Sequence, residues 1–144
     1  VGSPGQTSQS LGEDLYFLQS LDPHMVGIGP YVNHKDTPLK ESVSGSVGQT
    51  IYLISILRLM FPKANIPATT SLQTLNPRGR DRAILAGANV FMPNLTPPVH
   101  REDYSLYNNK AAFHMEAGEN LETLKRYIGD IGYEVVMDRG DAKK

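Results

Sequence analysis

The chain has 144 residues and a mass of 15.8 kDa, which fits one domain that is large enough to bury a core. With 40% hydrophobic residues, 20% charged residues and a formal net charge of −1, the composition argues against a disordered chain and gives no reason to expect nucleic acid or an anionic membrane surface as a partner. The chain has no cysteine, which excludes disulfides, cysteine nucleophiles and cysteine-ligated iron–sulfur clusters on these residues.

Apolar runs and the two ends of the chain give expectations about its location and its limits. No apolar run approaches the roughly 20 residues that span a bilayer, and no signal peptide opens the chain, so we expect a cytoplasmic protein. Residues 1–5 read as the end of a strand running into a turn, which predicts that the natural domain begins upstream. We expect residues 138–144, which are mostly charged, to be a frayed tail.

The first quarter of the chain predicts a helix followed by a strand. Thr7 is a plausible N-cap, and leucines spaced four and three residues apart continue an apolar stripe towards Leu21. The run from Met25 to Ile28 reads as a buried strand that closes at Gly29-Pro30, and a long polar loop follows over 31–46.

The rest of the chain repeats this order. Residues 49–61 predict a helix that is apolar nearly all round and is therefore expected to be covered on two sides. Short strands are predicted at 65–69 and 88–92, and a helix between them is expected to start at Asn76-Pro77 and end at Ala86-Gly87. Residues 93–118 are irregular and polar, and an amphipathic helix over 121–131 stops at Gly132.

Strict alternation of strands and helices is typical of an α/β fold with parallel strands. A full (β/α)8 TIM-type barrel takes about 250 residues, so the chain is a little over half of one. We therefore predict a single partial domain over 1–144, the C-terminal half of a barrel. The alternative is a small open doubly wound sheet.

Function in either architecture gathers at the carboxyl ends of the strands. Thr69 and Thr70 offer two successive hydroxyls there, although β-branched residues also simply suit a strand end. The turn at 2–7 could bind an anion through backbone amides, but a tight turn with a helix cap is favoured.

Other polar residues have simpler interpretations. His34 with Asp36 could suggest acid–base or metal chemistry, yet the four histidines have no ligand spacing and are expected to be solvated. Arg78, Arg80 and Arg82 are expected to form a solvated helix face.

Several strings, taken together, resemble the radical S-adenosylmethionine superfamily, and within it the HydE family of FeFe-hydrogenase maturases; biotin synthase and methylornithine synthase share the general scheme. The matching segments are 1–7, 25–31, 36–39, 65–70, 87–94 and 104–107. The resemblance implies that the chain runs from the end of the fifth barrel strand to the eighth strand and a C-terminal helix.

The resemblance also implies site residues. Met25, Pro30 and Val32 would contact S-adenosylmethionine. The substrate end of the lumen would be lined by Thr69, Thr70, Met92, Tyr104 and Tyr107. The family binds a 4Fe–4S cluster through a three-cysteine motif in the first strand–helix loop, and this chain does not contain that loop. We therefore expect neither a catalytic residue nor a metal ligand on the chain. We also expect that neither S-adenosylmethionine nor the cluster binds the chain stably.

The predicted function is therefore a fragment of a radical S-adenosylmethionine enzyme, inactive by itself, whose parent acts on a small molecule alongside other hydrogenase maturation proteins. The alternative is a stand-alone α/β binding domain for a small carboxylated or phosphorylated ligand. Because a half barrel leaves an apolar inner face uncovered, we expect the isolated chain to form a homo-oligomer, most economically a two-fold dimer.

Overall fold

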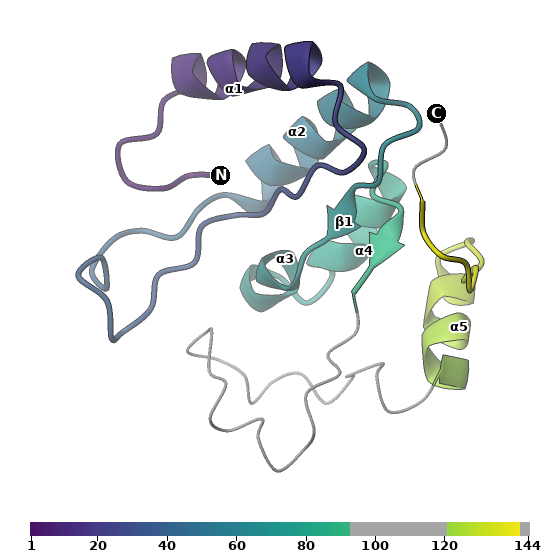
Figure 1. Cartoon of the computed structure of the whole chain (residues 1–144). Coiled ribbons are helices and arrows are strands. Elements are labelled where there is room, and N and C mark those ends of the chain that lie inside the picture. The colour runs from purple at the N-terminus through teal and green to yellow at the C-terminus, as the bar shows by residue number, and fades with distance from the viewer. Residues whose placement is uncertain (93–120, 142–144) are drawn as a thin grey trace.

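The computed structural model describes residues 1–92 and 121–141. Within these ranges the elements follow one another as the sequence predicts, with helices between short strands (Figure 1). In chain order they are helix α1 (Ser8–Leu21), helix α2 (Val47–Met60), strand β1 (Pro67–Ala68), helix α3 (Thr70–Leu75), helix α4 (Gly79–Leu85), strand β2 (Val90–Phe91) and helix α5 (Leu121–Asp130).

The strands are parallel. β1 pairs with β2, with Pro67 beside Val90. On the other side of β1, the extended segment that begins at Met25 forms a parallel bridge to Asn65. The strands predicted at 25–28, 65–69 and 88–92 are thus present in the predicted order, but the regular ladder in each is shorter than the sequence suggests.

The first residue of the chain extends this parallel layer. The Val1 amino group donates a hydrogen bond to the Gly29 carbonyl at 2.7 Å, and the Tyr31 N–H donates to the Val1 carbonyl at 2.8 Å. Four extended segments therefore lie side by side in the order in which they occur in the chain. This arrangement is a mixed α/β fold with consecutive parallel neighbours.

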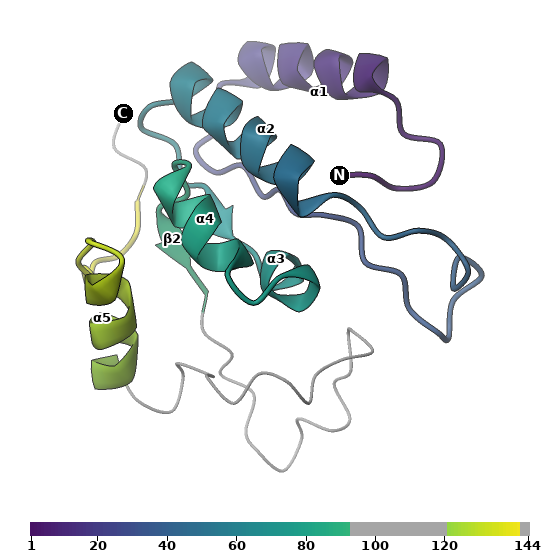
Figure 2. The same cartoon turned by 180° about the vertical axis from the view of Figure 1, so that it is seen from behind.

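Helices α2 and α4 cover one face of these segments. They lie behind the strands in Figure 1 and in front of them in Figure 2, which is turned by 180°. The core lies between the two layers and is made of aliphatic side chains from both. Its largest fully buried side chains are Ile54, Leu57, Ile66, Leu72 and Thr50.

Helix α1 confirms the predicted cap. The Thr7 hydroxyl accepts a hydrogen bond from the Ser10 N–H at 3.1 Å, and the Ser10 hydroxyl accepts one from the Thr7 N–H at 3.0 Å, which makes a reciprocal capping box. Leu15 and Leu18 pack against the core, but no residue of the helix is fully buried. Helix α1 is therefore attached along one partly buried edge.

Helix α2 differs from the prediction in its surroundings. It begins two residues earlier than expected, because the Ser46 hydroxyl caps it by accepting from the Gln49 N–H at 3.2 Å. The expectation that it is covered on two sides is wrong, since Tyr52 is 67% exposed and Leu59 is 82% exposed. Apolar residues all round a helix therefore did not mean burial all round.

The region between the two strands holds a second difference. Residues 70–75 form α3, where the sequence predicts no helix. The helix expected from Asn76-Pro77 begins at Gly79 instead. The Asn76 side chain accepts a hydrogen bond from the Arg78 N–H at 2.9 Å, so the Asn-Pro pair makes a turn between two helices and does not start one.

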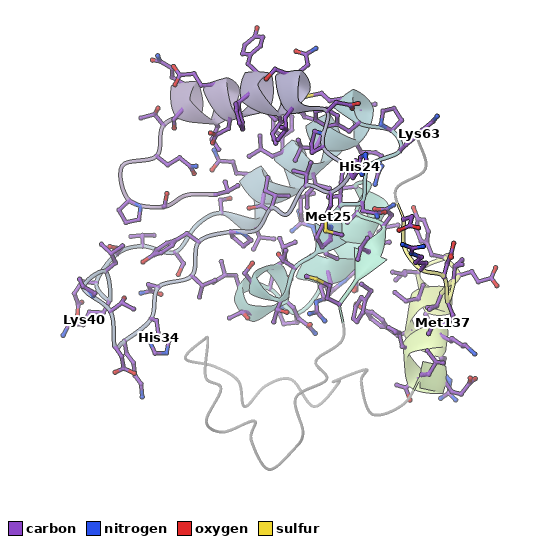
Figure 3. All side chains as sticks on the ribbon, in the orientation of Figure 1. His24, Met25, His34, Lys40, Lys63 and Met137 are labelled. Atoms are coloured by element: carbon purple, nitrogen blue, oxygen red, sulfur yellow. The ribbon has the colours of Figure 1, made fainter. Side chains whose placement is uncertain are left out.

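The C-terminal segment returns towards the amino end of β1. The Asn65 side-chain amide donates to the Gly140 carbonyl at 2.7 Å. Figure 3 shows Met137 on this segment, beside α5. In the described part of the chain, no helix is long and apolar enough to cross a bilayer.

Candidate functional site

The end of β1 brings two hydroxyls against the segment that closes at Pro30. The Thr69 and Ser71 hydroxyl oxygens lie 3.0 Å apart and share a hydrogen bond. A Cβ on Gly29 would lie 2.5 Å from the Ser71 oxygen and 2.7 Å from the Thr69 oxygen. Only glycine allows this close approach, so the sequence Gly29-Pro30 fits its neighbour at the carboxyl ends of the strands.

Thr70 is held by an arginine from α4. The Arg80 Nη2 donates a hydrogen bond to the Thr70 hydroxyl at 2.8 Å. The guanidinium carbon of Arg80 lies 4.6 Å from the centroid of the Phe91 ring, and the residue is only 7% exposed. The prediction that Arg78, Arg80 and Arg82 share a solvated face is therefore wrong for Arg80, because the hydroxyl and the ring bind it inside the fold.

A second polar contact joins α5 to the same region. The Tyr127 hydroxyl donates a hydrogen bond to the Asp81 carboxylate, and the Tyr127 ring meets the edge of Phe91 at a centroid distance of 6.2 Å. Burial raises the pKa of the Tyr127 phenol, and the hydrogen bond to Asp81 raises it further. Tyr127 is therefore a neutral hydrogen-bond donor that fixes α5 against α4 and β2.

The residues expected to contact S-adenosylmethionine lie at two levels of one segment. Met25 is beside Asn65, near the amino end of β1, and is 52% exposed. Figure 3 shows Met25 on the strand face that is turned away from α2 and α4. Pro30 is buried and Val32 is half-buried, and both follow Gly29, which touches Thr69. The structure thus brings Pro30 close to the threonines, and Met25 lies four residues below them along the strands.

Of the residues expected at the substrate end, the structure describes three. Thr69 and Thr70 lie together at the end of β1, and Met92 follows β2 directly and is 46% exposed. Tyr104 and Tyr107 lie outside the described residues. The roles of all five residues stay predictions.

Two expectations about loop residues can be compared with the structure. The turn at 2–7 has the favoured structure of a turn and a cap, with the Gln6 N–H donating to the Ser3 carbonyl at 3.0 Å. The His34 side chain is 19% exposed, so it is less solvated than predicted, and its Nδ1 accepts from the Asp36 N–H at 3.2 Å. Figure 3 shows His34 near the tip of the long loop, beside Lys40.

Sequence reasoning missed the side chains that organise this site. Arg80 and Tyr127 bind residues that lie 10 and 46 positions away in the chain, and Ser71 lies against Gly29, so no local spacing marks these side chains. The one available signal was Gly29, since a glycine at the end of a buried strand often indicates a close approach of another segment.

Comparison with known proteins identifies the family to which these features relate. No family model matches the chain. The chain is 39% identical over all of its 144 residues to the [FeFe] hydrogenase maturase subunit HydE of Thermotoga maritima. It is 34% identical to the 3-methylornithine synthase of Methanosarcina acetivorans over 130 residues, 90% of the chain, and 34% identical to that of Methanosarcina barkeri over 91 residues, 63% of the chain.

The chain is thus a relative of radical S-adenosylmethionine enzymes, as its strings predict. Within that superfamily it is similar to HydE, and this resemblance is confirmed across the full chain. The chain spans 41% of the length of that HydE, and 36% and 25% of the two synthases.

Proposed function

We propose that the chain is part of a radical S-adenosylmethionine enzyme of the HydE type and forms one side of its S-adenosylmethionine and substrate cavity. The observation that carries this proposal is the 39% identity to HydE over every residue of the chain. In this proposal the chain supplies the end of the fifth strand to the eighth strand of a (β/α)8 barrel. The remaining strands belong to the rest of the enzyme.

The geometry supports this part of a barrel. Four parallel segments lie in chain order, and α2 and α4 lie on one side of them, as in the outer ring of a barrel (Figures 1 and 2). Met25 and Met92 are exposed on a layer whose other side is covered, which suits residues that face a lumen. The hydroxyls of Thr69 and Thr70 lie at the carboxyl ends, where barrel enzymes place their chemistry.

The two cofactors of the superfamily fit this chain differently. A 4Fe–4S cluster needs thiolate ligands, and the chain has no cysteine. Among the described residues, no three His, Asp or Glu side chains gather to replace them. The cluster ligands must therefore come from residues beyond these 144, and the isolated chain is expected to be inactive. S-adenosylmethionine would be contacted by Met25, Pro30 and Val32.

The same proposal covers partners and place of action. The substrate would be a small molecule bound near Thr69, Thr70 and Met92, with Tyr104 and Tyr107 completing the site. The enzyme would act in the cytoplasm with other hydrogenase maturation proteins, and neither nucleic acid nor a membrane would take part.

The exposed strand layer also suggests how the isolated chain behaves. Without the first strands of the barrel, the apolar side chains that face the lumen would meet water, at about 25 cal/mol for each Å². We expect the chain to pair with a second copy that covers this face. Light scattering on dilute protein tests this, and a monodisperse species of the monomer mass would contradict it.

A hybrid enzyme tests the proposed function. The matching 144 residues of Thermotoga maritima HydE are replaced by this chain, the cluster is reconstituted without oxygen, and release of 5′-deoxyadenosine from S-adenosylmethionine is measured. We expect the hybrid to form 5′-deoxyadenosine, with unmodified HydE as positive control and the isolated chain as negative control. A hybrid that folds and carries its cluster but releases none would contradict the proposal and favour a stand-alone binding domain.

A further inference from the structure

Three consecutive residues with hydroxyl side chains follow β1, and their hydrogen-bond partners differ. Thr69 and Ser71 share one hydrogen bond in which either oxygen could be the donor. The Thr70 hydroxyl accepts a hydrogen bond from Arg80, and the Thr70 carbonyl accepts one from the Thr74 hydroxyl. The difference determines what each hydroxyl can offer to a ligand.

The direction of the Thr70 hydrogen bond is fixed by chemistry. A guanidinium carries only donors and stays protonated at every accessible pH, so the Thr70 oxygen must be the acceptor. A hydroxyl has one proton, and this one is not used by the bond to Arg80. Because Thr70 is exposed directly after β1, its proton can be donated to a group outside the fold. A charged donor also polarises the hydroxyl and strengthens the hydrogen bond that it donates.

The Arg80 side chain is well suited to hold this direction. It is buried, and its guanidinium stacks on Phe91, the last residue of β2. A flat cation fixed against a ring presents its N–H groups in a constant direction, which a flexible lysine would not do. Phe91 is itself held at its edge by Tyr127, so the position of the guanidinium depends on α4, β2 and α5 together.

We propose that Arg80 is a positioning residue that makes the Thr70 hydroxyl a fixed hydrogen-bond donor towards a ligand at the carboxyl ends of the strands. This inference rests on the proposed function only in placing Thr70 at a ligand cavity. The complementary ligand group is an electron-rich oxygen, such as that of a carboxylate or a carbonyl. Thr69 and Ser71 can adapt, since either hydroxyl can be the donor of the hydrogen bond between them, whereas the Thr70 oxygen can only accept from Arg80.

A double-mutant cycle on the 144-residue chain tests this, with acetate as the probe and NMR titration of the Thr70 amide as the readout. Arg80→Met and Thr70→Val are each expected to weaken acetate binding about fivefold, the loss typical of one hydrogen bond. The double variant should bind no more weakly than either single variant, because both substitutions remove the same interaction. Thr70→Ser keeps the hydroxyl and should stay within about twofold of the wild type. Arg80→Lys keeps a charged donor but not its fixed direction, so its affinity should lie between those of the wild type and Arg80→Met.

The matched control is Arg82→Met, which removes an equal charge from an exposed position of the same helix. It measures the general effect of lost positive charge and should leave the Arg80–Thr70 coupling unchanged. If Arg80→Met does not fold, Arg80→Leu, which also has no hydrogen-bond donor, takes its place in the same cycle.

Two results would overturn the inference: acetate that leaves the Thr70 amide unshifted, or losses from the two single variants that simply multiply in the double variant. These results are separate from those of the HydE hybrid. An inactive hybrid with a coupled Arg80–Thr70 pair would overturn the proposed function alone. An active hybrid without that coupling would overturn this inference alone.

Discussion

The two ends of the strand layer each hold an arginine, buried at the carboxyl end and partly buried at the amino end, and the two are bound by different groups. At the carboxyl end, the contacts of Arg80 include the Thr70 hydroxyl and the Phe91 ring. At the amino end, Arg58 of α2 donates hydrogen bonds to the backbone carbonyls of Gly87, Phe61, Pro62 and Ala64, over distances of 2.8 to 3.1 Å.

This difference shows how the two ends divide stability and function. Backbone carbonyls exist whatever the sequence, so the Arg58 contacts join the end of α2 to the chain entering β1 and β2 and serve the fold. Contacts to a hydroxyl and a ring depend on particular residues and leave a proton available for other use. In barrels, residues at the amino ends of the strands generally serve stability, and those at the carboxyl ends generally serve chemistry. The comparison predicts that variants at the amino end cost more stability.

The largest expected effect is that of Arg58→Met. The substitution removes the hydrogen bonds that Arg58 donates to four carbonyls. Although some of these carbonyls are partly exposed, we expect the free energy of unfolding to fall by about 3 kcal/mol. Urea unfolding followed by circular dichroism measures this. Arg126→Met, at an exposed position of α5, is the control and should stay within about 0.5 kcal/mol of the wild type. Equal losses from the two variants would show that the amino end is not held by Arg58.

Gly87→Ala tests the same end with a smaller change. Gly87 has φ = +120°, and a Cβ there would lie 2.7 Å from the Arg58 Cβ, so alanine is strained both by its backbone and by its neighbour. We expect the free energy of unfolding to fall by about 2 kcal/mol. The control is Gly129→Ala in α5, where a Cβ meets nothing within 4 Å and alanine should stabilise the helix by about 0.5 to 1 kcal/mol. A neutral Gly87→Ala would mean that Arg58 can move aside.

The sequence allowed the order of the elements to be predicted because that order depends on local signals. The Thr7 cap, the leucine spacing of α1 and the stop before Gly132 all act within a few residues, and the structure has helices at those places. The mixed α/β class follows from their alternation with apolar runs. The family resemblance came from the same strings and is confirmed by the match to HydE over all 144 residues of this chain.

The errors arose where distant residues decide the outcome. Arg80 looks like its neighbours Arg78 and Arg82 in sequence, and it is buried because Phe91 and Thr70 lie beside it in space. The Asn76-Pro77 pair has the residues of a helix start, but Asn76 caps the end of α3, and the pair forms the turn that leads to α4. The exposure of Leu59 likewise depends on which surfaces surround α2, and its own periodicity does not contain that information.

The smallest expected effect belongs to the carboxyl end, at Tyr127, and its dependence on pH distinguishes it from the others. Burial and the hydrogen bond to Asp81 raise the pKa of this phenol above its ordinary value of 10.0, so the folded chain holds the proton more tightly than the unfolded chain. The resulting stability is fully present below about pH 10 and is lost as the pH rises beyond it, because the unfolded phenol ionises first.

Tyr127→Phe should therefore lower the free energy of unfolding by about 1 kcal/mol at about pH 8, the loss typical of one hydrogen bond, and by less at about pH 10.5. Urea unfolding of both proteins at the two pH values measures this difference, with Tyr133→Phe at an exposed position as the control for general alkaline effects. If the difference in free energy of unfolding between the wild type and Tyr127→Phe is the same at both pH values, the hydrogen bond to Asp81 does not stabilise the fold. The ring packing of Tyr127 against Phe91 would then account for its whole contribution to holding α5.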